Sequence, residues 1–203
     1  MSESRHESYG QQGLTLVDRF GVYLSVRPVT NVIARYSNAR ILDIGCGYHA
    51  RLLQGLAPRI GTGVGVDVSI NPGLRAHPKL QFVEQSAEDA MATLSAGERF
   101  DVVMMVSVLE HLWEPQAILA SCHGLLRPGG SLIVNVPTWR GKTFLEFSAF
   151  RLGTSPAIEM NDHKMYYDKR DLWPLLVRAG FAPQGIAMKY HKFGLNLFAT
   201  ATR

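Results

Sequence analysis

The sequence has few cysteines and no long apolar run, which argues against a disulfide-stabilised protein and against a membrane-spanning one. Only two of its 203 residues are cysteine, Cys46 and Cys122, which is too few for a disulfide framework or a cysteine-based metal cluster. The longest apolar stretch, 102–109, is interrupted by Ser107 and is far shorter than the roughly 20 residues that span a bilayer. We expect one domain with a buried core, no membrane span and no metal ion.

The sequence also lacks a secretory signal and a run of basic residues. Residues 1–12 are polar and carry charges of both signs, so they lack the apolar centre of a signal peptide. We expect them to form a flexible tail and the protein to stay in the cytoplasm. The formal charge of +4 is scattered along the chain, which does not favour nucleic acid as a partner. The oligomeric state stays open.

Short apolar runs typical of strands alternate with segments that have a helical pattern. The runs lie at 40–44, 64–68, 80–84, 100–106 and 130–136, and the helical patterns at 49–57, 87–95, 114–126 and 168–179. This alternation predicts an α/β fold, with helices on both faces of a parallel sheet. Two further runs, 181–190 and 194–202, follow each other across a short turn, so they must be antiparallel. We therefore expect one reversed strand near the edge of the sheet.

The segment before the first predicted strand has its own helical pattern. Apolar residues recur at helical spacing over 13–37, and Pro28 predicts a break between two short helices. This segment is a candidate cover over a bound cofactor, and simple packing on the sheet is the alternative.

A glycine turn follows the first predicted strand. Residues 45–50 match G-x-G-x-x-A, and Asp67 stands about 20 residues later at the end of the next strand, a pattern that indicates a nucleoside-containing ligand. Asp43 precedes the first glycine by two positions, where its charge would repel a dinucleotide's pyrophosphate and attract an ammonium group. S-adenosylmethionine (SAM) offers both an adenosine and an ammonium group. Alternatively, Asp43 only caps the turn through backbone amides.

Together with five other segments, this turn resembles the class I SAM-dependent methyltransferases, in particular the branch of ubiquinone and menaquinone methyltransferases. The segments are ILDIGCG (41–47), GVDVS (65–69), SAEDA (86–90), FDVVMMVSVLEHL (100–112), LLRPGGSLIVNVP (125–137) and LVRAGF (176–181). The resemblance implies SAM as the cofactor. It also implies a Rossmann-like three-layer sandwich whose seven strands have the order 3-2-1-4-5-7-6, with strand 7 antiparallel.

By this resemblance the candidate cofactor-binding residues are Asp43, Gly45, Cys46, Gly47, Asp67, Val68, Ser86, Ala87, Glu88 and Ser107. It implies that Asp67 holds the ribose and that Val68 packs against the adenine. It places Ala87 and Glu88 beside the adenine edge, and Ser107 at the cofactor or facing the acceptor. The family often has aspartate where Ser86 stands, so the bond to the adenine amino group is expected from Ser86 or Glu88 instead.

Methyl transfer is an in-line displacement, so the protein mainly supplies alignment and exclusion of water. A general base helps if the acceptor is a hydroxyl group. The candidates are His111, just past the fourth strand, and His163; alternatively, His111 merely caps or packs. Tyr166 or Tyr167 is a candidate for orienting the acceptor, and one of the two is expected in the core.

Residues 137–165 form the one long connection and are expected to act as a lid over the substrate. Trp139, Arg140 and Lys142 lie at its start. One interpretation is a lid helix that packs on the core. The other is an acceptor pocket in which Arg140 and Lys142 bind the phosphate of a lipid-linked substrate.

The sequence therefore predicts SAM-dependent methylation of oxygen, carbon or nitrogen in a metabolite, a quinone-like compound, a glycan or a lipid-linked molecule. A non-catalytic SAM-binding partner subunit, a nicotinamide-dependent oxidoreductase and a nucleic-acid methyltransferase stay as alternatives. Asp43 and the reversed last strand disfavour the oxidoreductase. The Asn/Asp-Pro-Pro-aromatic tetrapeptide of amino-directed nucleic-acid enzymes is absent.

Overall fold

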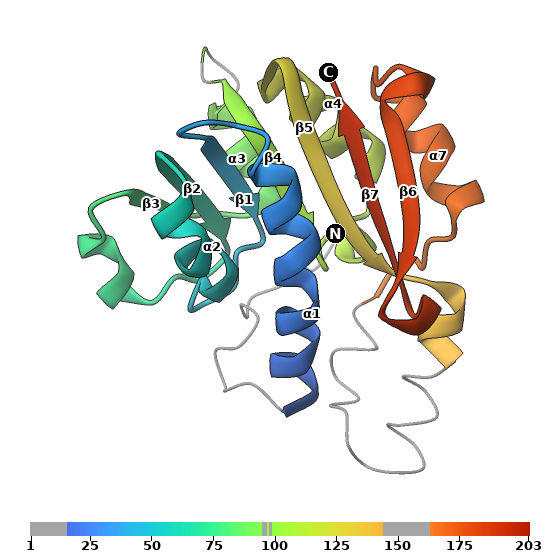
Figure 1. The fold of residues 1–203 in the computed structure, drawn as a ribbon, viewed down its shortest axis with the longest axis horizontal. Helices are drawn as coiled ribbons and strands as arrows, with labels where there is room; N and C mark the ends of the chain where they lie inside the picture. Colours follow the sequence, from blue (N-terminus) through green and yellow to red (C-terminus); the bar gives the residue numbers. More distant parts are fainter. Residues whose placement is uncertain (1–15, 95–96, 98, 144–162) are drawn as a thin grey trace.

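A computed structural model describes residues 16–94, 97, 99–143 and 163–203. The predicted tail over 1–12 and most of the predicted lid, residues 144–162, lie outside the described residues. The described part contains one seven-stranded sheet (Figure 1). Its strands are β1 (Arg40–Ile44), β2 (Thr62–Asp67), β3 (Leu80–Glu84), β4 (Phe100–Val106), β5 (Leu126–Pro137), β6 (Ile186–His191) and β7 (Asn196–Thr202).

The strand order is β3-β2-β1-β4-β5-β7-β6, as predicted. Strands β1 to β5 pair in parallel, whereas β7 runs antiparallel to both of its neighbours, β5 and β6. The strand order reverses between β1 and β4. From β1 the chain continues toward one edge of the sheet, through β2 and β3, and from β4 it continues toward the other edge. In an open α/β sheet, ligands bind at such a point, beyond the carboxyl ends of the strands.

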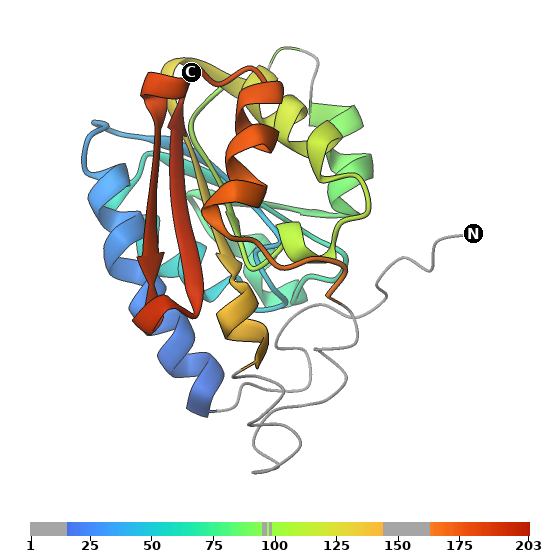
Figure 2. The same cartoon turned by 90° about the vertical axis from the view of Figure 1, so that its right-hand side faces the viewer.

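Helices cover both faces of the sheet and complete a three-layer sandwich (Figure 2). One face carries α1 (Leu16–Ile33) and α2 (Arg51–Leu56), and the other carries α3 (Ala87–Leu94), α4 (Pro115–Leu125) and α7 (Lys169–Arg178). Alternate residues of a strand serve the two faces: Ile41 belongs to the core under α1 and α2, whereas Leu42 belongs to the core under α3, α4 and α7. Within the described ranges no helix is long and apolar enough to cross a membrane.

The prediction that Pro28 separates two helices is wrong, because α1 continues through this residue. Proline lacks the N–H that would bond the carbonyl four residues earlier, and here that carbonyl belongs to Leu24. The Leu24 backbone lies near the imidazole of His191, at the end of β6, and raises the pKa of that ring, against the larger lowering by burial. A side chain from the far end of the sequence therefore lies near the turn in which Pro28 leaves a carbonyl without its helical donor.

Several other boundaries differ from the predicted ones, and three of the shifts have a local reason. Helix α2 begins at Arg51, after Ala50 adopts a left-handed φ of 44°. Strand β5 begins at Leu126, four residues earlier than predicted, because Leu126 pairs with Phe100 before a register shift. Strand β6 begins only at Ile186, since a short 3-10 helix occupies Pro183–Gly185.

Candidate functional site

The glycine turn follows β1 at the point where the strand order reverses. The amides of Gly45 and Cys46 both donate to the Val66 carbonyl, at 2.8 and 3.0 Å, so the turn is fixed to the end of β2. Gly45 and Gly47 have φ values of +71° and +78°, in the left-handed region that favours glycine. A Cβ added to Gly45 would lie 2.2 Å from Cγ2 of Val108. The turn therefore requires glycine at position 45.

Asp67 lies beside the turn at the end of β2. Its Oδ2 accepts from the Gly47 amide at 2.7 Å, and its Oδ1 accepts from the Val68 amide at 2.9 Å. Asp67 and Val68 are both half-buried. Because each carboxylate oxygen can accept more than one hydrogen bond, the two amides leave further acceptor capacity. Asp67 thus supports the turn and can also accept hydrogen bonds from the hydroxyl groups of a ligand.

Asp43 lies under the turn and is almost fully buried, with 2% of its surface exposed. Its Oδ2 has no hydrogen-bond partner among the described residues, so this oxygen caps no backbone amide there. Burial raises the pKa of the carboxyl well above its ordinary value, and the charge of Asp67 raises it further. Burial and the same two acids also raise the pKa of the neighbouring Cys46 thiol. A cationic group placed here would be stabilised by two carboxylates.

Three of the residues predicted beside the adenine lie at the start of α3. The Ser86 hydroxyl accepts from the Asp89 amide at 3.1 Å and donates to the Asp89 carboxylate at 2.8 Å, so it caps the helix. Ala87 is half-buried, and Glu88 is exposed. The Ser86 oxygen keeps one further acceptor position beside its capping bonds, so Ser86 and Glu88 both stay predicted partners of the adenine amino group.

Ser107 comes directly after β4, across from the glycine turn. It has a left-handed φ of 59°, its amide donates to the Asn135 carbonyl at 2.8 Å, and it is exposed. The next residue, Val108, is the one that approaches Gly45. The ends of β1 and β4 are therefore in contact at the predicted binding position.

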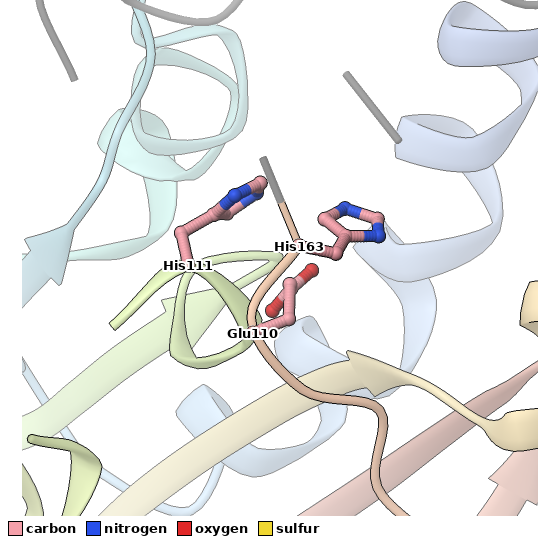
Figure 3. Close-up of side chains that lie close together, drawn as sticks. All are labelled: Glu110, His111 and His163. Carbon is pink, nitrogen blue, oxygen red and sulfur yellow. The ribbon is translucent and has the colours of Figure 1, made fainter. Parts of the chain in front are cut away.

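The two candidate bases lie close together although they are 52 positions apart in the sequence (Figure 3). His111 ends the short 3-10 helix Leu109–His111, and His163 lies on the segment before α7. Their ring centroids are 4.7 Å apart. The Glu110 carbonyl accepts from the amides of Lys164 and Met165, at 2.7 and 3.3 Å. These backbone bonds hold the segment of His163 against the end of β4.

An aromatic row continues from His163. Its Nδ1 lies 3.0 Å from the Tyr166 hydroxyl, and the Tyr166 ring lies 5.7 Å from the Trp139 ring. The Trp139 indole N–H donates to the Asp171 carboxylate at 3.1 Å. Tyr166 is buried and Trp139 is exposed. The structure thus brings together four predicted site residues, namely His111, His163, Tyr166 and Trp139.

The two residues predicted to bind a phosphate differ in exposure. Arg140 is exposed and Lys142 is half-buried, in a helical segment over 139–143. The Arg140 guanidinium faces Gly194, in the turn between β6 and β7. These cations lie at the start of the predicted lid.

Sequence reasoning missed two charged residues at this site. Glu110 is buried, with 1% of its surface exposed, and Lys192 follows β6. Burial lowers the pKa of the Lys192 ammonium to about 8, and the charge of Glu110 opposes that shift. Adjacency to His111 was the only sequence signal for Glu110. Nothing in the sequence places Lys192 near it, because β6 is far along the chain.

A separate cavity of about 500 Å³ opens near the amino ends of β2 and β3. Arg40, Arg75, His77 and Lys79 contribute to its lining. The Lys79 ammonium donates to two backbone carbonyls, and Arg75 pairs with Glu84. These cations have structural partners, and parallel sheets bind ligands at the opposite, carboxyl end of their strands.

The reversed last strand and the glycine turn between two carboxylates define a Rossmann-like α/β protein with a nucleoside-type site. The chain belongs to the methyltransferase domain family, whose family model matches residues 22–184.

Parts of this chain are similar in sequence to known proteins. It is 37% identical over 117 residues to a ubiquinone biosynthesis O-methyltransferase of Cereibacter sphaeroides, with 54% of this chain and 45% of the relative covered. It is 33% identical over 156 residues to that of Dinoroseobacter shibae, with 73% and 62% covered. The chain thus spans about half the length of the curated relatives it matches.

A solved structure shares the fold across most of the chain. The 1,6-didemethyltoxoflavin-N1-methyltransferase of Burkholderia thailandensis, solved with its substrate and S-adenosylhomocysteine, superposes with a TM-score of 0.63. The sequences are 20% identical, and the match covers 92% of this chain and 81% of the other.

Proposed function

We propose that the chain binds SAM beyond the carboxyl ends of β1, β2 and β4 and transfers its methyl group to a hydroxyl oxygen of a small acceptor. The observation that carries the proposal is the pair Asp43 and Asp67 around the glycine turn. The buried Asp43 Oδ2, which has no hydrogen-bond partner among the described residues, suits an ammonium group. The spare acceptor capacity of Asp67 suits the two hydroxyls of a ribose.

The chain's own residues act by binding and orientation. When bound, SAM supplies an activated methyl group on a sulfonium, so the reaction needs no protein nucleophile. Alignment of the two reactants can contribute on the order of 7 kcal/mol or more, which exceeds the roughly 3 to 5 kcal/mol that a general base adds. The rigid turn, fixed by two bonds to Val66, would provide that alignment on the cofactor side.

On the acceptor side, the row His111, His163, Tyr166 and Trp139 would line the pocket. His111 and His163 are the groups at hand to accept the proton of a hydroxyl acceptor, and Tyr166 would orient its ring. The two curated relatives are named as O-methyltransferases of ubiquinone biosynthesis, which supports a hydroxyl on a quinone-like ring.

Arg140 and Lys142 would add phosphate contacts if the acceptor is lipid-linked. Replacing both by alanine should then weaken acceptor binding and leave SAM affinity as in the wild type, and unchanged acceptor binding would contradict that role. We further propose that residues 1–203 form a single cytoplasmic domain with 137–165 as its substrate lid.

The test measures transfer of a labelled methyl group from SAM to a panel of phenols, catechols and hydroxyquinones. The formation of S-adenosylhomocysteine is measured in the same assay. We expect a methyl ether that carries the label with at least one acceptor, and loss of that product in Asp67→Ala at subsaturating SAM. The matched control is Glu114→Gln, which alters an exposed acid that is not among the predicted site residues. SAM binding without product from any oxygen acceptor would contradict O-methylation.

A further inference from the structure

Three potential metal ligands converge beyond the end of β4 (Figure 3). Glu110, His111 and His163 each offer a ligand atom, and these atoms all lie within 4.8 Å of one another. Glu110 and His111 are neighbours on one 3-10 helix, whereas His163 comes from the segment before α7. We propose that these three residues bind a divalent first-row transition-metal cation.

The donor set favours this class of cation. One carboxylate and two imidazoles are typical ligands of Zn²⁺, Mn²⁺, Fe²⁺ and Co²⁺. Mg²⁺ and Ca²⁺ prefer sites made of oxygen ligands. The sequence predicted no metal because its cysteines form no cluster, yet this set contains no cysteine. His163 becomes a third ligand only when the chain folds, since it lies 52 residues after His111.

The geometry needs only a small adjustment. Ligand atoms about 2.0 to 2.2 Å from one cation lie roughly 3.0 to 3.5 Å apart when they are adjacent in its coordination sphere. The ligand atoms here are up to 4.8 Å apart. Side-chain rotations that move these atoms by about 1 Å would bring them within ligand distance of one cation. The amides of Lys164 and Met165, which donate to the Glu110 carbonyl, already hold the two segments of the site together.

The surroundings of His163 also fit a metal ligand. A ligating histidine normally bonds an outer partner through its second ring nitrogen, which fixes the ring's orientation. The Tyr166 hydroxyl lies 3.0 Å from Nδ1 of His163, so Nε2 is the nitrogen that the proposal assigns to the cation. Tyr166 in turn packs edge-on against the His163 ring and beside Trp139.

Three protein ligands leave coordination positions open for oxygen. A bound cation lowers the pKa of a water or hydroxyl ligand and orients it. At this place the ligand would be the acceptor hydroxyl: its proton would leave to water, and the anionic oxygen would attack the methyl carbon as the carbon–sulfur bond breaks. His111 and His163 would then hold the cation instead of taking the proton. This use of the cation rests on the proposed function, whereas its binding does not.

The test is a titration of the full chain, stripped with a chelator, with Co²⁺ followed by visible absorption and with Zn²⁺ followed by calorimetry. We expect one saturable cation per chain. His163→Ala should weaken the affinity at least about tenfold, as loss of a ligand requires, and Glu110→Gln should do the same. His77→Ala, a histidine outside the cluster, should bind as the wild type does.

A parallel titration with SAM separates the two proposals. His163→Ala should keep the wild-type SAM affinity, which also shows that the variant is folded. Because His163 is half-buried, this variant still decides the question if Glu110→Gln, at a buried position, does not fold. Wild-type protein that binds no cation, or His163→Ala that binds it equally well, would overturn the metal site. Cation binding without SAM binding would instead overturn the proposed function.

Discussion

The carboxylate of Asp67 accepts a hydrogen bond from the Gly47 amide at 2.7 Å, which ties the end of β2 to the glycine turn after β1. The same side chain accepts from the Val68 amide. We predict that Asp67→Ala lowers the free energy of unfolding of the ligand-free protein by about 2 kcal/mol, as expected for a charge-assisted bond. Urea denaturation measures this change. Wild-type stability in the variant would show that Asp67 serves only the ligand.

Asp43→Asn is predicted to have opposite effects on stability and on cofactor binding. The folded pKa of Asp43 is raised above 3.8 by burial and by Asp67, so the fold favours the protonated carboxyl, and stability is lost as the pH rises through the folded pKa. The asparagine variant avoids that loss. We therefore expect it to unfold at higher urea concentration than the wild type at neutral pH, with the advantage vanishing below pH 3.8.

The same variant should bind SAM more weakly, by roughly tenfold to a hundredfold, because a neutral amide cannot replace a charge-assisted bond to an ammonium group. Calorimetry at neutral pH measures this loss. Equal SAM affinity in Asp43→Asn would mean that the ammonium group lies elsewhere.

Gly45 and Val108 should be coupled in a double-mutant cycle. In Gly45→Ala the new Cβ would lie 2.2 Å from Cγ2 of Val108, and the residue must keep a φ of +71°. We expect a destabilisation of about 2 to 3 kcal/mol, of which the left-handed backbone accounts for about 1 kcal/mol. Adding Val108→Ala should restore only the steric part, which gives a coupling of about 1 to 2 kcal/mol. Additive effects would mean that Val108 does not limit residue 45.

Lys192→Met should change the pH dependence of stability. The pKa of Lys192 falls from 10.5 to about 8 in the folded protein. Between these values the unfolded chain binds more protons, so stability rises with pH across this window, and the cost of burying the ammonium is fully present below about pH 8. The variant should be more stable at pH 7 by about 2 to 3 kcal/mol, after allowance for partial exposure.

The difference between Lys192→Met and the wild type should disappear near pH 10.5, where lysine is neutral in both states. Thermal unfolding of the two proteins from pH 7 to 10.5 checks this trend. A difference that stays constant over this range would contradict the role of the buried charge.

The sequence predicted the fold well because its main signals are local. The β-branched run in β2 and the glycines after β1 act through neighbouring residues, and the short turn at His191 forces β6 and β7 to be antiparallel. Pro28 was misjudged for the opposite reason. Helix α1 continues through it, and the nearby His191 comes from the far end of the chain, which no local pattern reveals.

The candidate site could be predicted on the cofactor side more fully than on the acceptor side. Asp43 and Asp67 stand at fixed distances from the glycine turn, so the strand ends bring them together in any fold of this order. Glu110, His163 and Lys192 meet only through tertiary packing. The Ser86 hydroxyl caps α3, and its bond to the adenine amino group stays a prediction.

Calorimetric titration with SAM, and in parallel with NADH, tests the central claim most directly. We predict that the wild type binds SAM with micromolar affinity and that Asp67→Ala weakens this binding by roughly 1 to 3 kcal/mol, while Glu114→Gln leaves it unchanged. NADH should give no heat. Binding of NADH without binding of SAM would contradict the account.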